Sequence, residues 1–131
     1  MCKKLICLTT VLLLSGPGLA IAADPQPVAW WQLDETSGTT AAEVVGGKDG
    51  VLTGDPVWIV GQIGGGLQFD GTDDFVTLPI GALLGSLSDI TVTTWANFSH
   101  AGGAWQRIFD FGSGTGTYMF LCPRVGTNGV M

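Results

Sequence analysis

The chain is 131 residues long, and its eleven acidic and five basic residues give a formal net charge of −6 at pH 7. This length accommodates one domain. The acidic balance and the lack of a basic run argue against binding to nucleic acid or to an anionic membrane, both of which attract positive charge.

The first 22 residues have the layout of a secretory signal peptide. Lys3 and Lys4 precede an apolar run over residues 5–14, and Ala20 and Ala22 form an A-x-A cleavage pattern. A membrane anchor is the alternative, but the apolar run is shorter than the about 20 residues that a helix needs to span a bilayer. We therefore expect cleavage after Ala22, no stable membrane anchor, and a secreted, cell-surface or periplasmic location.

Cleavage would leave residues 23–131, with three bases against all eleven acids and a formal charge of −8. Cys122 is then the only cysteine, so no internal disulfide forms in a compartment that would permit one. Such a thiol either pairs with another chain or is buried, and we expect burial. Residues 23–27 form a short polar leader, and residues 28–131 are predicted to be one domain.

Short apolar segments alternate with glycine-rich turns along this domain. The segments are VAWWQL (28–33), VL (51–52), VWIV (57–60), LQF (67–69), FVTL (75–78), WQRIFDF (105–111) and YMFL (118–121). The cleanest strand pattern is ITVTTWANF at residues 90–98, while GALLGSLSD at 81–89 has room for one helical turn. No segment sustains a 3.6-residue period. Many short strands separated by turns predict an all-β sandwich or barrel.

No residue pattern in the sequence is typical of an enzyme. Glu35 and Glu43 are the only glutamates, and they do not form the alternating acids of a glycosidase strand. His100 is the only histidine, without clustered metal ligands or a G-x-S-x-G nucleophile motif. The loops GQIGGG (61–66) and GSGTG (112–116) lack the order of a phosphate-binding loop. We predict a non-enzymatic protein without an obligatory cofactor.

Aromatic residues are the first candidates for binding. Five tryptophans are many for this length, and their rings either pack in a core or stack on the apolar faces of ligands such as sugars. The residues expected in the core are Trp31, Trp58 and Trp95. The residues expected to reach a surface and touch a ligand are Trp30, Trp105 and Tyr118.

The acidic stretch GGGLQFDGTDDFVTLP at 64–79 is the second candidate. Asp70, Asp73 and Asp74 offer hard oxygen ligands of the kind that calcium takes, usually about six to eight of them. Aspartates also stabilise turns by accepting hydrogen bonds from nearby backbone. The spacing is not that of an EF-hand loop and the ligand set is incomplete, so we expect a turn, with calcium as the alternative.

Five stretches follow one another along the chain. They are VAWWQLDETSGTTA, KDGVLTG, GGGLQFDGTDDFVTLP, LSDITVTTWANF and WQRIFDFGSGTGTYMFL. In this order they resemble the laminin G-like domains of the concanavalin A-like jelly-roll superfamily, in their bacterial secreted form. The resemblance implies two packed antiparallel sheets and a mostly non-catalytic role in binding glycans or proteins, in some members with calcium. It places Trp31 and Leu33 at core positions of the first strand, and Phe69 and Phe75 at the apolar flanks of the Asp-Gly turn.

Members of that family continue past a YMFL-like strand into several more strands, whereas this sequence ends at Met131. We therefore expect an incomplete jelly-roll sandwich with exposed apolar sheet surface and unpaired strand edges, through which the chain can self-associate. The predicted function is a secreted, non-catalytic module that binds a glycan or an extracellular protein. A structural or adhesion fragment of a larger surface protein is the alternative. A glucanase-like hydrolase is less favoured, because the paired-acid strand is absent.

Overall fold

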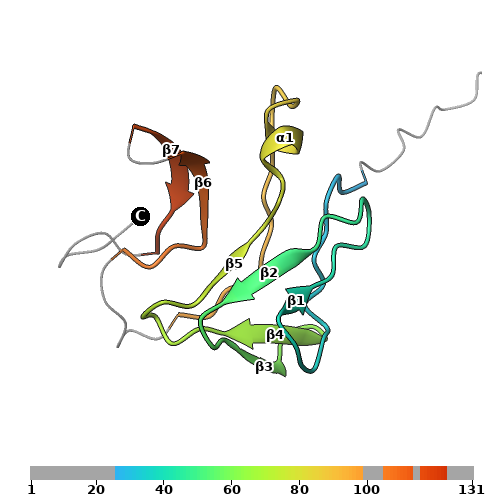
Figure 1. The fold of residues 1–131 in the computed structure, drawn as a ribbon, viewed down its shortest axis with the longest axis vertical. Helices are drawn as coiled ribbons and strands as arrows, with labels where there is room; N and C mark the ends of the chain where they lie inside the picture. The colour runs from blue at the N-terminus through green and yellow to red at the C-terminus, as the bar shows by residue number, and fades with distance from the viewer. Residues whose placement is uncertain (1–25, 99–104, 114–115, 124–131) are drawn as a thin grey trace, which may run out of the picture.

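The computed structural model describes residues 26–98, 105–113 and 116–123. Its strands form three small antiparallel sheets (Figure 1). The largest sheet joins β1 (Thr40–Ala41), β2 (Gly50–Thr53) and β5 (Phe75–Thr77) in the order β1-β2-β5. The other two sheets are the pairs of β3 (Val57–Val60) with β4 (Gly65–Gln68) and of β6 (Phe109–Ser113) with β7 (Thr117–Leu121). One helical turn, α1 (Gly81–Leu84), follows β5.

The described part of the chain is therefore all-β with little helix, as the sequence predicts. Strands occur at VL, VWIV, LQ, FVT and YMFL, and the expected helical turn forms at residues 81–84. The predicted signal peptide and His100 lie outside the described residues. None of the helical structure in the described ranges is both long and apolar enough to cross a membrane.

Side-chain alternation explains the central sheet. In β2, Gly50 and Leu52 are buried while Val51 and Thr53 are exposed, which is the period of two expected of a strand with one covered face. Leu52 pairs with Val76 of β5, and Thr40 of β1 pairs with Val51. Antiparallel pairing gives the backbone N–H and C=O groups of these short strands hydrogen-bond partners, which a lone strand would find only in water.

The strand prediction for residues 90–98 was wrong. All nine residues are exposed and none belongs to a strand. Trp95, expected in the core, is 77% exposed. Alternation stabilises a strand only where a neighbour takes up its backbone N–H and C=O groups and one face is covered. In the described ranges, no backbone hydrogen bond joins this segment to another strand.

The first predicted strand, at residues 28–33, was also wrong. Among the residues that the structure describes, its only ladder contact is an isolated bridge between Trp31 and Glu43. Leu33 adopts a left-handed backbone with a φ of 59°, which interrupts an extended strand. In the same way, β6 starts at Phe109 and not at Trp105, whose φ is 71°.

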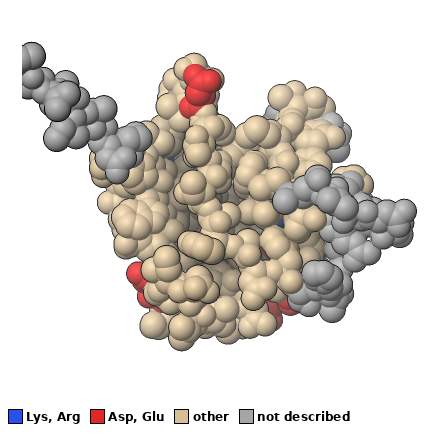
Figure 2. Space-filling model, turned by 180° about the vertical axis from the view of Figure 1, so that it is seen from behind, with Lys and Arg blue, Asp and Glu red and all other residues tan. Residues whose placement is uncertain are grey.

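The described residues bury a small core. The buried apolar residues are Ala41, Leu52, Ile80 and Cys122, and no large side chain among those described is fully buried. Burial of the Cys122 thiol is as expected. Trp31 and Trp58 are half-buried, and their indole N–H groups donate to the carbonyls of Lys48 (3.0 Å) and Gly38 (2.8 Å). Figure 2 shows a face on which acidic side chains appear only near the margins. A jelly-roll sandwich remains a prediction.

Candidate functional site

The β6–β7 hairpin carries aromatic side chains on both faces. Its register pairs Asp110 with Phe120 and Gly112 with Tyr118. Because successive side chains of a strand point to opposite faces, these four residues share one face. The opposite face carries the apolar side chains of Phe109, Phe111, Met119 and Leu121 and, at its end, Thr117.

Phe120 is the centre of the first face. The Tyr118 ring stacks against it, with ring centroids 5.4 Å apart and an angle of 16° between the planes. The Trp105 ring meets it edge-on, at 6.4 Å and 66°. The guanidinium carbon of Arg107 lies over the Phe120 ring, 4.6 Å from its centre, and Arg107 forms an ion pair with Asp110. We call Trp105, Arg107, Asp110, Tyr118 and Phe120 the aromatic cluster.

Trp105 and Tyr118 leave much of their surface open, at 52% and 53% exposed. The left-handed backbone of Trp105 is unusual for a bulky side chain. Such conformations persist where the surroundings hold them, and they are enriched at ligand sites. Here the residue with the unusual backbone carries the indole that meets Phe120.

Gly112 allows β6 and β7 to approach closely beside Tyr118. A Cβ at Gly112 would lie 2.5 Å from the carbonyl oxygen of Thr117 and 2.7 Å from both Cα and Cβ of Tyr118, closer than non-bonded atoms approach. An aromatic side chain opposite a strand glycine covers the bare backbone there. The pairing of Gly112 with Tyr118 therefore sets where the Tyr118 side chain leaves the hairpin backbone.

The aromatic cluster combines apolar rings with polar groups at its edge. The rings offer flat apolar surface. The Arg107 guanidinium has N–H donors, the Asp110 carboxylate has acceptors, and the Tyr118 hydroxyl is both. This arrangement suits a flat ligand that has an apolar face and a rim of hydroxyl groups.

Trp30, the third residue expected to touch a ligand, lies elsewhere. Its backbone N–H donates to Oε1 of Glu43 (2.9 Å), and its carbonyl accepts from the N–H of Val44 (3.0 Å). Its side chain is 50% exposed. Figure 1 shows this N-terminal segment on the far side of the β1-β2-β5 sheet from the β6–β7 hairpin. The structure thus brings together two of the three predicted ligand residues, Trp105 and Tyr118, and not Trp30.

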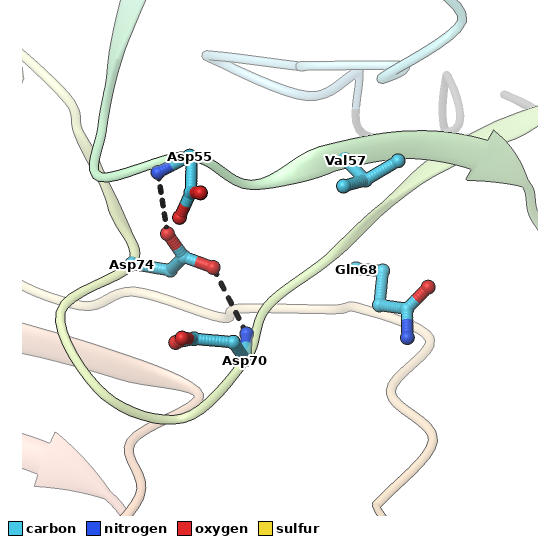
Figure 3. A pocket seen from close by; sticks show the side chains of 5 residues that line it. All are labelled: Asp55, Val57, Gln68, Asp70 and Asp74. Carbon is cyan, nitrogen blue, oxygen red and sulfur yellow. Dashed lines mark hydrogen bonds between the residues drawn. The ribbon is translucent and has the colours of Figure 1, made fainter.

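The acidic turn after β4 meets the loop before β3. Val57 pairs with Gln68 at the end of the β3–β4 sheet, which brings Asp55 towards Asp70. One carboxylate oxygen from each of Asp55, Asp70 and Asp73 lies within 4.8 Å of the others, and all three residues are exposed. A cavity of about 240 Å³ lies there (Figure 3), and it is lined by Asp55, Val57, Gln68, Asp70 and Asp74.

Asp74 links the acidic turn to the loop before β3 through hydrogen bonds. Its Oδ1 accepts the N–H of Asp55 (2.8 Å) and its Oδ2 the N–H of Asp70 (2.9 Å), as the dashed lines in Figure 3 mark. Asp70 in turn accepts the N–H of Thr72 at 2.7 Å, and Gly71 takes a φ of 80° that favours glycine. The carboxylates close enough to share a cation are those of Asp55, Asp70 and Asp73, whereas the sequence suggested Asp70, Asp73 and Asp74. These three carboxylates supply only part of the about six to eight oxygens that calcium takes.

Glu43 is buried, at 5% exposed, and it organises the turn after β1. Its carboxylate accepts four backbone N–H groups, from Trp30 (2.9 Å), Val45 (2.8 Å), Gly46 (2.6 Å) and Lys48 (3.1 Å). Burial raises the pKa of this carboxyl, but the four donors favour the charged form more strongly and lower the pKa from 4.5 to about 2. Glu43 therefore has a structural role.

Glu35 has a similar local role. Its Oε1 accepts the N–H of Ala42 at 2.8 Å, while its Oε2 is buried and has no hydrogen-bond partner among the described residues. The neighbouring Asp34 accepts the N–H of Gly65 (2.7 Å) and so ties the loop after Leu33 to β4.

Sequence reasoning missed three members of the aromatic cluster, Arg107, Asp110 and Phe120. A signal for Phe120 was present, because alternation in YMFL puts Tyr118 and Phe120 on one face. No local pattern joins Asp55 to the acidic turn, since strand pairing brings them together.

Comparisons with protein-family models, with curated proteins and with solved structures find no match to this chain. The laminin G-like resemblance therefore stays a prediction.

Proposed function

We propose that the chain is a secreted, non-catalytic binding module and that the aromatic cluster is its glycan-binding surface. One observation carries the proposal: two half-exposed rings, Trp105 and Tyr118, contact Phe120 beside the Arg107–Asp110 pair. A pyranose ring has C–H-lined faces that rest on aromatic rings, and hydroxyls at its edge that need donors and acceptors.

The non-catalytic part of the proposal is supported by the two glutamates. Glycoside hydrolysis uses two carboxyl groups that flank the scissile bond. Glu43 is buried and already accepts four backbone N–H groups, and Glu35 accepts one. Appreciable β-glucan hydrolysis that is abolished by Glu35→Gln would contradict a purely binding role.

The proposed fold is a laminin G-like jelly roll, which is supported by the antiparallel all-β strands and the five family-like stretches. In this proposal the hairpin presents its aromatic cluster outward while other strands supply the scaffold. The secreted location follows from the signal-peptide pattern of residues 1–22.

Affinity measurements on immobilised polysaccharides test the proposal. A panel of neutral and anionic polymers is presented to the full chain, with folding checked by circular dichroism. We expect binding to at least one polymer, and a loss of about tenfold or more for Trp105→Ala and for Tyr118→Ala, because each removes a stacking ring. Trp30→Ala is the matched control, since it removes an equally exposed aromatic side chain outside the cluster. A folded chain that binds no polymer would refute the proposal.

A structural or adhesion role within a larger surface protein is the second candidate, and the exposed apolar surface favours it. Large apolar side chains are exposed on β3 and β7 and along residues 90–98. Apolar patches of this kind mark contacts with other proteins or with further copies of the chain. Analytical ultracentrifugation tests this role: a chain that stays monomeric at high concentration would contradict self-association.

A further inference from the structure

The charge of Arg107 is balanced within the aromatic cluster. Its Nη1 contacts Oδ2 of Asp110, and its guanidinium carbon lies over the Phe120 ring. The side chains of Arg107 and Asp110 are 44% and 38% exposed, so a ligand on the cluster can reach both. A guanidinium binds a carboxylate or sulfate best when its charge is not already paired.

Asp110 also keeps a negative charge at the ligand face. The β6–β7 register pairs Asp110 with Phe120, which directs its carboxylate to the same side as the rings. An anionic ligand stacked on Tyr118 or Trp105 would therefore lie near this carboxylate, and like charges close together disfavour binding. The excess of acids over bases in the whole chain acts in the same direction.

The polar edge of the cluster matches hydroxyl groups. Beyond the Nη1–Oδ2 contact, Arg107 has further N–H donors, and Oδ1 of Asp110 is an acceptor beside them. A sugar hydroxyl both donates and accepts, so two adjacent hydroxyls can use both groups at once. A carboxylate or sulfate can use only the donors and is repelled by the acceptor.

We propose that the aromatic cluster selects neutral glycans and discriminates against uronic-acid or sulfated ones. This inference rests on the proposed glycan-binding function and adds the ligand class. The neutral sugar ring stacks on Tyr118 and Trp105, and the Arg107–Asp110 pair binds its hydroxyls.

The test compares binding of the full chain to a neutral glucan, a neutral mannan and polygalacturonate, each immobilised for biolayer interferometry. We expect the dissociation constant for a neutral polymer to be at least about tenfold lower than for polygalacturonate at low salt. The dissociation constant for a neutral polymer should change by less than about twofold between about 20 mM and about 300 mM salt, because binding a neutral polymer neutralises no net charge.

Asp110→Asn is the decisive variant, because it keeps the side-chain shape and releases the charge of Arg107. It should raise affinity for polygalacturonate at least about threefold and introduce salt sensitivity. Lys48 is a described base in the turn after β1, and its printed hydrogen bonds, with Trp31 and Glu43, use its backbone. Lys48→Gln therefore serves as the control and should leave the preference unchanged.

The outcomes separate the two proposals. If the wild-type chain binds polygalacturonate as tightly as the neutral polymers, the selectivity is refuted while glycan binding stands. An Asp110→Asn variant that folds and gains no anionic binding also overturns the selectivity. If the folded wild-type chain binds none of the three polymers, and none of the wider panel, both proposals fail.

Discussion

Replacement of Asp74 by alanine should destabilise the acidic corner, which consists of Asp55, Asp70, Asp73 and Asp74. Both carboxylate oxygens of Asp74 accept backbone N–H groups, those of Asp55 and Asp70, at 2.8 and 2.9 Å. A hydrogen bond of this kind contributes about 1 kcal/mol net, and both amides can turn to water when the carboxylate is gone. The free energy of unfolding should therefore fall by about 2 kcal/mol, which lowers Tm by roughly 10 °C in a domain of this size.

Asp73→Ala is the matched control for this prediction. Asp73 is exposed and its carboxylate lies among the same acids, but no hydrogen bond to a described residue is found for it. Its removal relieves like-charge repulsion, so we expect a change within about 0.5 kcal/mol.

Thermal unfolding followed by circular dichroism gives the stability change, and amide hydrogen exchange gives its location. In Asp74→Ala the amides of Asp55 and Asp70 should lose protection, while those of the β6–β7 strands keep theirs. Equal destabilisation by Asp73→Ala and Asp74→Ala would refute the assignment of the corner to Asp74. A stabilisation by Asp74→Ala would do so as well, since it would make charge repulsion the dominant effect.

Two further predictions concern Glu43 and Gly112. The folded-state pKa of Glu43, about 2, lies below its ordinary value of 4.5, so its stabilising effect is complete above about pH 4.5 and is lost as the pH falls towards 2. A pH series of melting curves should show this acid step, and Glu43→Gln should lower Tm at neutral pH and flatten the step; an unchanged acid profile would contradict it. Gly112→Val should force β6 and β7 apart beside Tyr118, cost about 1–3 kcal/mol through overpacking and weaken glycan binding. Wild-type affinity in a folded Gly112→Val variant would show that the position of Tyr118 does not matter.

Local pattern was enough to predict most of the strands. VWIV, FVT and YMFL are short apolar runs bounded by turn residues, and each is a strand in the structure. The helical turn at residues 81–84 was predicted for the same kind of reason. The positions of these elements can be predicted from local sequence because turn residues and the alternation of apolar side chains depend only on residues a few positions apart.

Pairing and burial were not predictable in the same way. Residues 90–98 have the best alternation and yet no described strand pairs with them, so Trp95 is exposed. Glu43, a charged residue, is buried because the backbone of its own turn supplies four donors. Each outcome depends on partners that are distant in sequence or on loop geometry, which a single-sequence pattern does not encode.

The candidate site, too, was only partly predictable from the sequence. Aromatic character alone selected Trp105 and Tyr118 correctly as exposed side chains, but also selected Trp30, which lies outside the cluster. The ring contacts with Phe120 and the Arg107–Asp110 pair appear only once β6 and β7 are aligned.

Chemical-shift mapping with a neutral oligosaccharide tests the glycan-binding surface most directly. An isotope-labelled chain is titrated while the indole signals of the tryptophans and the backbone amides are followed. We predict that the largest shifts fall on Trp105 and on the amides of Tyr118 and Phe120, with Trp30 unchanged. Shifts centred on Trp30 or on the acidic corner, with the β6–β7 hairpin unaffected, would contradict the proposed binding surface.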